Sequence, residues 1–412
     1  MTSIYLVGVG MTQFGRLKHL SMKDIVKEAV TAALKDAGTT VDEIEAAYFS
    51  NATQGALEGQ FMIPGQVALR PLGLQGIPVV NVENACASAS TAFNLACKEI
   101  KSGESSVVLA VGADKMNHPD KEKMMGVFDG ALDVHARDET INGLLAMSEG
   151  MELPPEALEE GGQRSVFMDV YAAMARFHMK NFGTTQRQIA AVAAKNHHHS
   201  VHNELSQFRQ DFTIDEVLAA RAISWPITLP MCSPVSDGGA AAILCSEEAL
   251  DKFDRSRAIK ISASVLTSGT NHAPELVEQH ITRIAALKAY NIAGIGPEDI
   301  SVAEVHDATA FGEILQTENL GFCPMGEGGA LAESGETALG GRIPVNSSGG
   351  LESKGHPVGA TGIGQIYELA QQLRGEAGPR QVENARVAIA ENGGGVYGIE
   401  EAAACITILE KI

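Results

Sequence analysis

Several features that define other classes of protein are scarce in this 412-residue chain. Aromatic residues make up 5% of it and only one is tryptophan, which argues against an aromatic-rich binding surface. Lys and Arg number 31 against 51 Asp and Glu, so no basic excess exists to neutralise the phosphates of a nucleic acid or an anionic membrane. No apolar run reaches the length of a bilayer span, and residues 1–10 have the pattern of a strand and its turn, not of an export signal.

Metal-binding and disulfide patterns are also missing. The six cysteines (86, 97, 232, 245, 323 and 405) show no CxxC spacing, which argues against zinc and disulfide frameworks and favours a reducing compartment such as the cytoplasm. His197, His198 and His199, with His202, have a helical spacing that suits a metal, yet no carboxylate or cysteine completes a ligand set. We expect a solvated helix face there and no metal site.

Length and patterning favour a large α/β protein. An apolar content of 45% and 43 glycines suit close packing of helices on sheets. Strand-like and helix-like segments alternate along the chain, which predicts largely parallel sheets. The predicted elements of the first third are strands at 4–9, 44–50, 79–82 and 107–113 and helices at 21–37 and from residue 86 to 100.

The chain contains an internal repeat. Residues 41–53 match residues 297–309, and 238–244 has its counterpart in 401–409. The segment that opens at Cys86, with the strand 107–113, corresponds to residues 353–373 and a strand at 387–390. A repeat of this kind predicts two similar βα halves. We assign residues 1–118 and 231–255 to the N-terminal half, 119–230 to an inserted helical loop domain, and 256–412 to the C-terminal half.

Cys86 lies where a predicted strand turns into a predicted helix. Unpaired amides and the dipole at a helix N-terminus lower the pKa of a thiol and can hold an oxyanion. A lone cysteine is more often a small buried apolar residue, so this stretch is a weak signal by itself. The repeat strengthens it, because helices related by a pseudo-twofold axis would bring Cys86 and His356 into one pocket, as an activated cysteine nucleophile requires.

Four segments together resemble the active-site loops of the thiolase superfamily. They are Cys86 in its elbow, His306 in His-Asp-Ala-Thr-Ala-Phe, His356 in Gly-His-Pro-Val-Gly-Ala-Thr-Gly, and the late loop Glu391-Asn392-Gly393-Gly394-Gly395. The histidine form of the second loop resembles the sterol-carrier-protein-type thiolases in particular, and the similarity extends over essentially the whole chain. The resemblance implies a thiolase fold, in which two similar βα halves form a layered αβαβα core with an inserted helical loop domain.

The resemblance also implies roles for individual residues. Cys86 is expected to take the acyl group as a thioester, and His356 to accept the thiol proton. His306 is expected to polarise the substrate oxygen together with His356. The backbone of Cys86 and of Asn392-Gly393 is expected to form a second oxyanion site.

Glu391 departs from the family pattern. Most thiolases have a cysteine at this acid/base position, and sterol-carrier-protein-type members tend to have a histidine. Cys405 lies too far along the chain to replace it. A carboxylate can move the α-proton if burial raises its pKa towards neutrality, so we expect Glu391 to be catalytic, the alternative being a purely structural change.

The activity implied is thiolytic cleavage of a 3-oxoacyl-CoA, or the reverse Claisen condensation, through an acyl-cysteine. Coenzyme A is the co-substrate, and no metal or redox cofactor is needed. The phenylalanines and methionines of the insertion (Met124, Met125, Phe128, Phe167 and Met168) suit a bulky or aromatic acyl group such as that of benzoylsuccinyl-CoA, although core packing explains them equally well.

The resemblance further implies a homodimer or larger assembly and, as in bacterial members, a small zinc-ribbon/OB-fold partner subunit. Two other classes of function stay open. One is a thiolase-like retro-aldol lyase acting on acyl-CoA, which would not need an acyl-cysteine. The other is a non-catalytic lipid or acyl-CoA binding protein.

Overall fold

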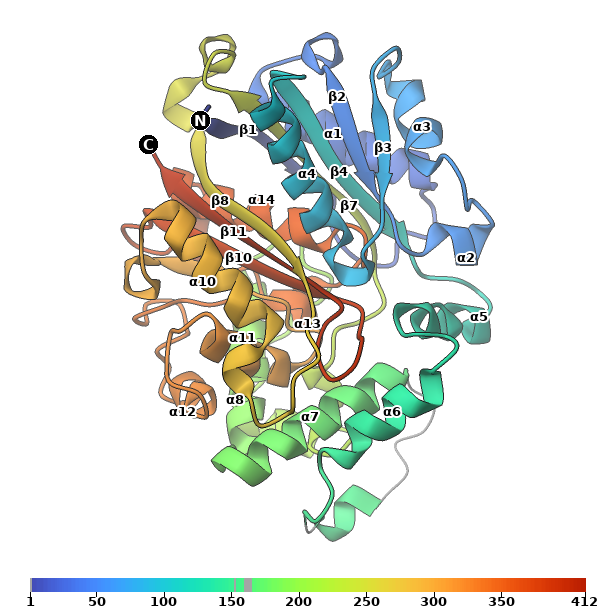
Figure 1. The fold of residues 1–412 in the computed structure, drawn as a ribbon, viewed down its shortest axis with the longest axis vertical. Helices are drawn as coiled ribbons and strands as arrows, with labels where there is room; N and C mark the ends of the chain where they lie inside the picture. The colour runs from blue at the N-terminus through green and yellow to red at the C-terminus, as the bar shows by residue number, and fades with distance from the viewer. Residues whose placement is uncertain (1, 152, 159–164) are drawn as a thin grey trace.

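The core of the protein is a nine-stranded sheet in a computed structural model that describes residues 2–151, 153–158 and 165–412 (Figure 1). Its strand order is β3-β2-β4-β7-β1-β8-β11-β10-β9. The bounds are β1 Ile4–Met11, β2 Ala46–Ser50, β3 Val79–Val82, β4 Val107–Lys115, β7 Asp237–Ser246, β8 Ile259–Ser268, β9 Val302–Glu304, β10 Val387–Gly394 and β11 Ala403–Lys411. Only two residue pairs join β1 to β8, Tyr5 with Lys260 and Leu6 with Ile259, so the sheet consists of two half-sheets that share a narrow seam.

The two half-sheets have the same topology, which confirms the repeat. In the N-terminal half β2, β4, β7 and β1 follow one another across the sheet, and β9, β10, β11 and β8 do so in the C-terminal half. The place of β3 is taken in the second half by a parallel bridge between Ala303 and Val345. The expectation of largely parallel sheets was wrong. β2–β3, β2–β4 and β9–β10 are parallel, whereas β1–β7, β1–β8, β4–β7, β8–β11 and β10–β11 are antiparallel.

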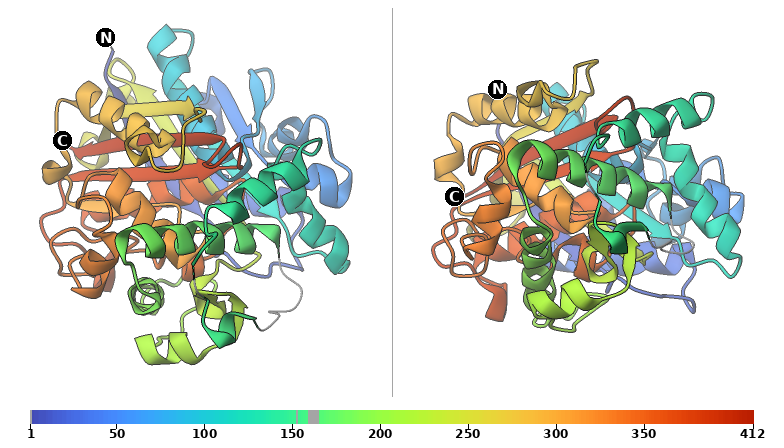
Figure 2. Two further views of the ribbon diagram at one scale, coloured as in Figure 1. Left: turned by 60° about the horizontal axis from the view of Figure 1, so that its bottom comes forward. Right: turned by 90° about the horizontal axis from the view of Figure 1, so that it is seen from below.

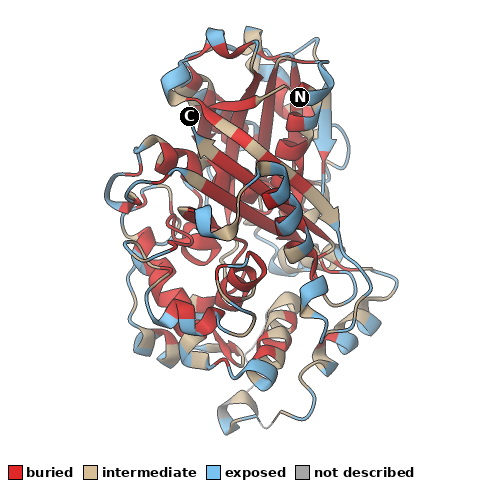
Figure 3. Ribbon diagram, turned by 60° about the vertical axis from the view of Figure 1, so that its left-hand side comes forward, coloured by how far each residue is buried: buried red, intermediate tan, exposed pale blue. Residues whose placement is uncertain are grey.

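Helices cover both half-sheets and separate them, as predicted for the layered αβαβα core. The outer helices are α1 (Met22–Ala37) and α10 (Ile281–Ala293), and the inner ones are α4 (Ser88–Ser102) and α14 (Thr361–Arg374). In Figure 1, α10 lies in front of the C-terminal strands and α1 behind the N-terminal ones. One apolar cluster includes residues of α4, of α14 and of strands from both halves, and most of these strands are buried, whereas buried and half-buried residues alternate in β8 (Figure 3).

The chain between β4 and β7 is mostly helical. It contains α5 (Lys121–Gly126), α6 (Arg137–Ala146), α7 (Val166–Phe182), α8 (Gln186–Ser200), α9 (Ile214–Ala219) and a hairpin of β5 (Ala222–Ser224) and β6 (Ile227–Thr228). These helices, coloured green in Figure 2, gather on one side of the sheet. The domain limits at residues 118, 230 and 255 stay a prediction. None of the helices in the described ranges is long and apolar enough to cross a membrane.

Helix α8 is not the solvated face that the histidine run suggested. It packs against α11 (Ala310–Asn319) and α12 (Gly328–Glu333) of the C-terminal half, and His197 and His199 are buried. His199 Nδ1 lies 3.0 Å from the Asn346 carbonyl oxygen and His197 Nε2 lies 3.1 Å from that of Pro230. His198 and His202 are exposed, and His198 pairs with Asp211.

Contact between the halves depends on Gly112 in β4. A Cβ atom there would lie 2.1 Å from the Gly359 carbonyl oxygen and 2.5 Å from Ser50 Oγ, atoms that hydrogen-bond to each other. We expect Gly112→Ala to lower the melting temperature by several degrees, because a backbone carbonyl in a packed interior cannot move aside cheaply.

Gly143→Ala is the matched control. Gly143 lies inside α6 with no atom within 4 Å of its Cβ position, so alanine there is expected to leave the melting temperature unchanged or to raise it slightly. Equal melting temperatures for the two variants in differential scanning calorimetry would contradict the importance of the Gly112 contact.

Candidate active site

Cys86 occupies a strained elbow between β3 and α4. It lies in a 3₁₀ turn, Ala85–Ala87, which precedes α4. Ala85 has a φ of 49°, a left-handed conformation that is unfavourable for a residue with a Cβ. The turn is closed by Ser88, whose Oγ accepts from the Asn84 amide at 2.8 Å and donates to the Ala85 carbonyl at 2.6 Å. These contacts fix the thiol at the end of the helix that the sequence predicts.

The thiol faces His356. His356 Nε2 lies 3.3 Å from Cys86 Sγ, although the two residues are 270 positions apart. His356 comes from the loop between α13 (Gly350–Lys354) and α14, and its backbone N–H donates to Ser236 Oγ at 2.9 Å. The structure therefore brings the predicted nucleophile and the predicted base into direct contact.

Thr361 sets the orientation and tautomer of the His356 ring. Thr361 Oγ1 lies 2.6 Å from His356 Nδ1 and donates its single hydroxyl proton to the Pro357 carbonyl at 3.0 Å. The hydroxyl can then only accept from Nδ1–H. Nε2 is left without a proton and faces the thiol, as a general base must. The sequence did not point to this role, although Thr361 is part of the Gly-His-Pro-Val-Gly-Ala-Thr-Gly run.

Burial keeps this pair neutral at rest. Desolvation, together with the smaller effect of the charge of Asp114, raises the pKa of the Cys86 thiol to about 12. The N–H groups of Gly395 and of Cys86 itself act in the opposite direction but do not prevail, so the expected thiolate was wrong for the resting site. Burial also lowers the pKa of His356 well below its usual value, with smaller contributions from His306 and Lys354.

His306 completes the group. Its ring centroid lies 5.3 Å from that of His356, and the ligand atoms of Cys86, His306 and His356 lie within 4.8 Å of one another. Neither ring nitrogen of His306 has a hydrogen-bond partner in the described chain, and burial lowers its pKa to about 4. A neutral imidazole with a free N–H can donate to a substrate oxygen. Atoms of these types can also ligate a soft cation such as zinc, which would block the thiol.

The late loop differs from its prediction, because Glu391, Asn392 and Gly393 lie in β10. They pair there with Ile406, Cys405 and Ala404 of β11. The buried Glu391 carboxylate accepts the backbone N–H of His306 at 2.8 Å, and burial raises its pKa well above the usual range.

The contacts of Asn392 and the position of Gly393 bear on the second oxyanion site. Asn392 Oδ1 accepts from the Ser90 hydroxyl at 2.8 Å. The N–H of Gly395, beyond the end of β10, lowers the pKa of the Cys86 thiol. The oxyanion amide expected of Gly393 stays a prediction.

Comparisons with known proteins show the family to which the chain belongs. The family model described as "Thiolase, N-terminal domain" matches residues 4–217, and "Thiolase C-terminal domain-like" matches residues 262–411. The chain belongs to the thiolase family. It is 38% identical to "Non-specific lipid-transfer protein-like 2" of Caenorhabditis elegans over 96% of this chain and 95% of that protein.

Two further relatives carry names of acyl-CoA enzymes. The "Acetyl-CoA acetyltransferase" of Methanothermobacter thermautotrophicus is 36% identical over 97% of this chain and 98% of its own. The "Benzoylsuccinyl-CoA thiolase subunit BbsB" of Thauera aromatica is 32% identical over 95% and 94%.

Solved structures share the thiolase fold. The structure of the "Ltp2-ChsH2(DUF35) aldolase" superposes with a TM-score of 0.76 at 20% identity, over 99% of this chain and 98% of that chain. Human mitochondrial 3-ketoacyl-CoA thiolase superposes with a TM-score of 0.69 at 16% identity, over 100% and 99%.

Two cavities of this thiolase-family protein meet at Cys86. One of about 340 Å³ opens towards the insertion and is lined by both histidines, Met125, Phe167, Met168 and Arg221. The other, of about 450 Å³, lies on the side of α2 (Gln54–Glu58) and α3 (Pro64–Leu69) and is lined by Phe49 and Phe61 among others. Phe128 and Ala131 line both. Met124 lines neither; it lies at a separate surface hollow beside Lys121.

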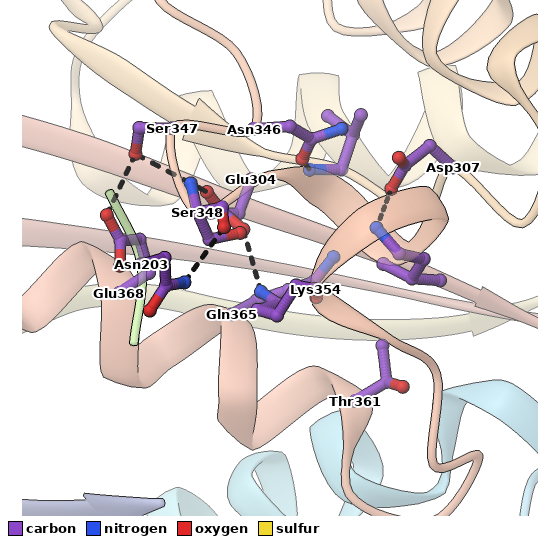
Figure 4. Close-up of polar contacts among 12 residues, drawn as sticks. Asn203, Glu304, Asp307, Asn346, Ser347, Ser348, Lys354, Thr361, Gln365 and Glu368 are labelled. Carbon is purple, nitrogen blue, oxygen red and sulfur yellow. Dashed lines mark hydrogen bonds and ion pairs between the residues drawn. The ribbon is translucent and has the colours of Figure 1, made fainter. Parts of the chain in front are cut away.

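A buried ion pair connects the loops that carry His306 and His356. Lys354 Nζ lies 3.1 Å from Glu304 Oε2, and both side chains are almost completely buried. Glu304 is two residues before His306, and Lys354 is two residues before His356. Figure 4 shows this pair with Ser348, whose hydroxyl donates to Glu304 Oε2 at 2.6 Å. The sequence contained an indication of this ion pair, because a charged residue in a predicted buried strand or helix needs a partner of opposite charge.

Thr361→Val tests the tautomer assignment. The substitution keeps the side-chain shape but removes the acceptor of His356 Nδ1–H. The tautomer with the proton on Nδ1 then loses the stabilisation of about one hydrogen bond. We expect alkylation of Cys86 by iodoacetamide at pH 8 to slow by about threefold to tenfold. The rate is measured on the Cys86 peptide by mass spectrometry.

Thr361→Ser is the control, since it keeps the hydroxyl, and its rate is expected to stay close to that of the native protein. Valine and serine variants with the same alkylation rate would show that Thr361 does not orient the base.

Proposed function

We propose that this thiolase-family protein cleaves a 3-oxoacyl-CoA with coenzyme A, or runs the reverse condensation, through an acyl group on Cys86. The observation that carries the proposal is the contact of Cys86 Sγ with His356 Nε2, the nitrogen that Thr361 leaves without a proton. An acyl-cysteine mechanism needs this arrangement, in which a thiol touches a correctly oriented base.

The residues present allow each step of acyl transfer. Cys86 gives its proton to His356 Nε2, and the sulfur attacks the C3 carbonyl carbon. The N–H groups of Cys86 and Gly395, which face the sulfur, stabilise the oxyanion. The C2–C3 bond breaks and its electron pair stays on C2, which takes up a proton. The thiol of coenzyme A then attacks the acyl-cysteine, and the sulfur of Cys86 recovers its proton from His356.

The two cavities give the two parts of the substrate separate routes to Cys86. Arg221 lines the cavity on the insertion side, is exposed, and makes no side-chain hydrogen bond or ion pair within the described ranges. In a chain of net charge −20, such a cation suits the phosphates of coenzyme A. The second cavity, lined by Phe49, Phe61 and Phe128, then receives the acyl group. Its aromatic walls favour a bulky or aromatic acyl chain, as in benzoylsuccinyl-CoA.

A retro-aldol lyase is the second candidate, because one structural neighbour is named an aldolase. Such a lyase would act on a 3-hydroxyacyl-CoA and release a carbonyl product without acylating the enzyme. The retained pair of Cys86 and His356 favours the thiolase reaction.

Acyl trapping on Cys86 tests the proposed function. The protein is mixed with acetoacetyl-CoA, 3-oxohexadecanoyl-CoA or 3-oxo-3-phenylpropionyl-CoA, and its peptides are examined by mass spectrometry. We expect the mass of the acyl group on the Cys86 peptide and none in Cys86→Ala.

Cys232→Ala is the matched control, because Cys232 lines the same cavity and its loss should leave acylation intact. Absence of any acyl-enzyme with every probe, together with carbonyl release from a 3-hydroxyacyl-CoA, would favour the lyase. Binding of the probes without either reaction would favour a lipid-binding role.

We further propose a homodimer in a reducing compartment such as the cytoplasm, where coenzyme A is the co-substrate and no other cofactor takes part. All six cysteines are free, which suits that compartment. The edge strand β3 and the adjacent Phe61, Met62 and Ile63 form an exposed apolar face, with Met62 78% exposed. A zinc-ribbon/OB-fold partner subunit is a second proposed contact, supported by the DUF35 protein that the name of the aldolase neighbour includes.

Met62→Asp tests the dimer. A charge on this face would have to be desolvated on association, so we expect the variant to be monomeric in light scattering where the native protein is a dimer. Leu287→Asp on α10, at an apolar residue that is 55% exposed, is expected to stay dimeric. Equal masses for both variants and the native protein would contradict this interface.

A further inference from the structure

We propose that Glu401 is the acid/base residue that moves the proton at C2, a role expected of Glu391. The inference rests on the proposed thiolase function and names a further catalytic residue for it. It follows from which carboxylate lines the insertion-side cavity that Cys86 shares with His306 and His356.

Glu401 lies in the substrate cavity, whereas Glu391 does not. Glu401 lies two residues before β11, and its side chain lines the 340 Å³ cavity together with Cys86, His306 and His356. Among the residues that the structure describes, it is the only Asp or Glu in that lining. Glu391 is fully buried outside the cavity, where one oxygen accepts the backbone N–H of His306.

Gln316 and His280 hold the Glu401 carboxylate in place. Oε1 accepts from Gln316 Nε2 at 2.9 Å. Oε2 forms an ion-pair contact of 3.3 Å with His280 Nε2, outside hydrogen-bond geometry in the described parts of the chain. The residue is only 7% exposed, so the carboxylate is shielded from bulk water.

Gly393 makes room for Glu401. A Cβ at Gly393 would lie 2.7 Å from Glu401 Cγ and 3.1 Å from Oε1, so any side chain there would push the carboxylate away. Glycine at this position therefore gives Glu401 its place. The charge of Glu401 also contributes to the raised pKa of Glu391, and a protonated Glu391 is not a base.

The step balances in both directions. In cleavage, the proton that Cys86 gives to His356 passes to the Glu401 carboxylate and from there to the electron pair of the broken C2–C3 bond, which releases acetyl-CoA. The Glu401 carboxylate then removes the thiol proton of the incoming coenzyme A, whose sulfur attacks the acyl-Cys86, and this proton returns through His356 to the sulfur of Cys86. In condensation, His356 returns the proton of Cys86 to the CoA released on acetylation, and the Glu401 carboxylate then removes the α-proton of a second acetyl-CoA.

Exchange of the α-protons of acetyl-CoA in D₂O isolates this step. We measure deuterium uptake and acetylation of Cys86 by mass spectrometry in Glu401→Gln, in Glu391→Gln and in the native protein. Loss of a general base costs about 100-fold or more, so we expect Glu401→Gln to lose exchange by that factor while Cys86 is still acetylated within about tenfold of the native rate. Glu391→Gln is expected to keep exchange within about tenfold.

Glu401→Asp keeps the charge and serves as a second test in case the glutamine variant does not fold. Its shorter side chain withdraws the carboxylate, so exchange should fall by about tenfold or more while the melting temperature stays near native. Native exchange in both Glu401 variants, or its loss in Glu391→Gln alone, would overturn the proposal. Failure of the native protein to acetylate Cys86 would instead overturn the proposed thiolase function.

Discussion

The contact between Cys86 and His356 is the constraint on which the rest of the structure depends. A gap of 3.3 Å between a sulfur and a nitrogen from opposite halves is possible only if the halves dock closely. Polar contacts around Gly359 provide this docking. Its carbonyl accepts from Ser50 Oγ, and its N–H donates to Asp114 Oδ2 at 2.5 Å. Gly112 has no side chain to separate these groups, so the backbone of one half lies directly on the strand ends of the other.

Asp114 contributes more to this docking than to the chemistry. Its carboxylate is fully buried and accepts from the Thr53 hydroxyl and amide and from Asn51. Burial raises its pKa to about 6, and the charge it carries at neutral pH raises the pKa of the Cys86 thiol. The same residue that joins the halves therefore opposes a resting thiolate.

A neutral resting pair has a consequence for catalysis. Moving the proton from Cys86 to His356 creates a thiolate and an imidazolium in a cavity of low polarity. This charge separation is unfavourable unless the negative charge moves from the sulfur to a group that the site stabilises. A bound thioester supplies that change, because its oxygen becomes negative as the sulfur attacks and the amides of Cys86 and Gly395 already face the sulfur. The thiol is thus protected from other electrophiles and reacts when a carbonyl is in place.

Sequence patterns were sufficient for the repeat, the layered fold and the meeting of Cys86 with His356. Each of these depends on periodicity or on a run of several residues, such as Gly-His-Pro-Val-Gly-Ala-Thr-Gly, and survives small errors in element limits. The state of the thiol was not accessible, because the sequence shows the helix N-terminus but not the burial that outweighs it. The burial of His197 and His199 was missed for a similar reason, since α8 has a partner on the far side that only the tertiary structure supplies.

The motif at residues 391–395 does not reveal which carboxylate lines the cavity. β10 was expected to end at residue 390 but continues to Gly394, so its residues alternate between the two faces of a sheet. Glu391 and Gly393 share a face, and Asn392 turns to Ser90 on the other. Because Gly393 has no side chain, the side chain of Glu401, two residues before β11, occupies the space beside it. Glu401 lines the cavity although it stands outside the sequence motif, and only the tertiary contact with Gly393 reveals it.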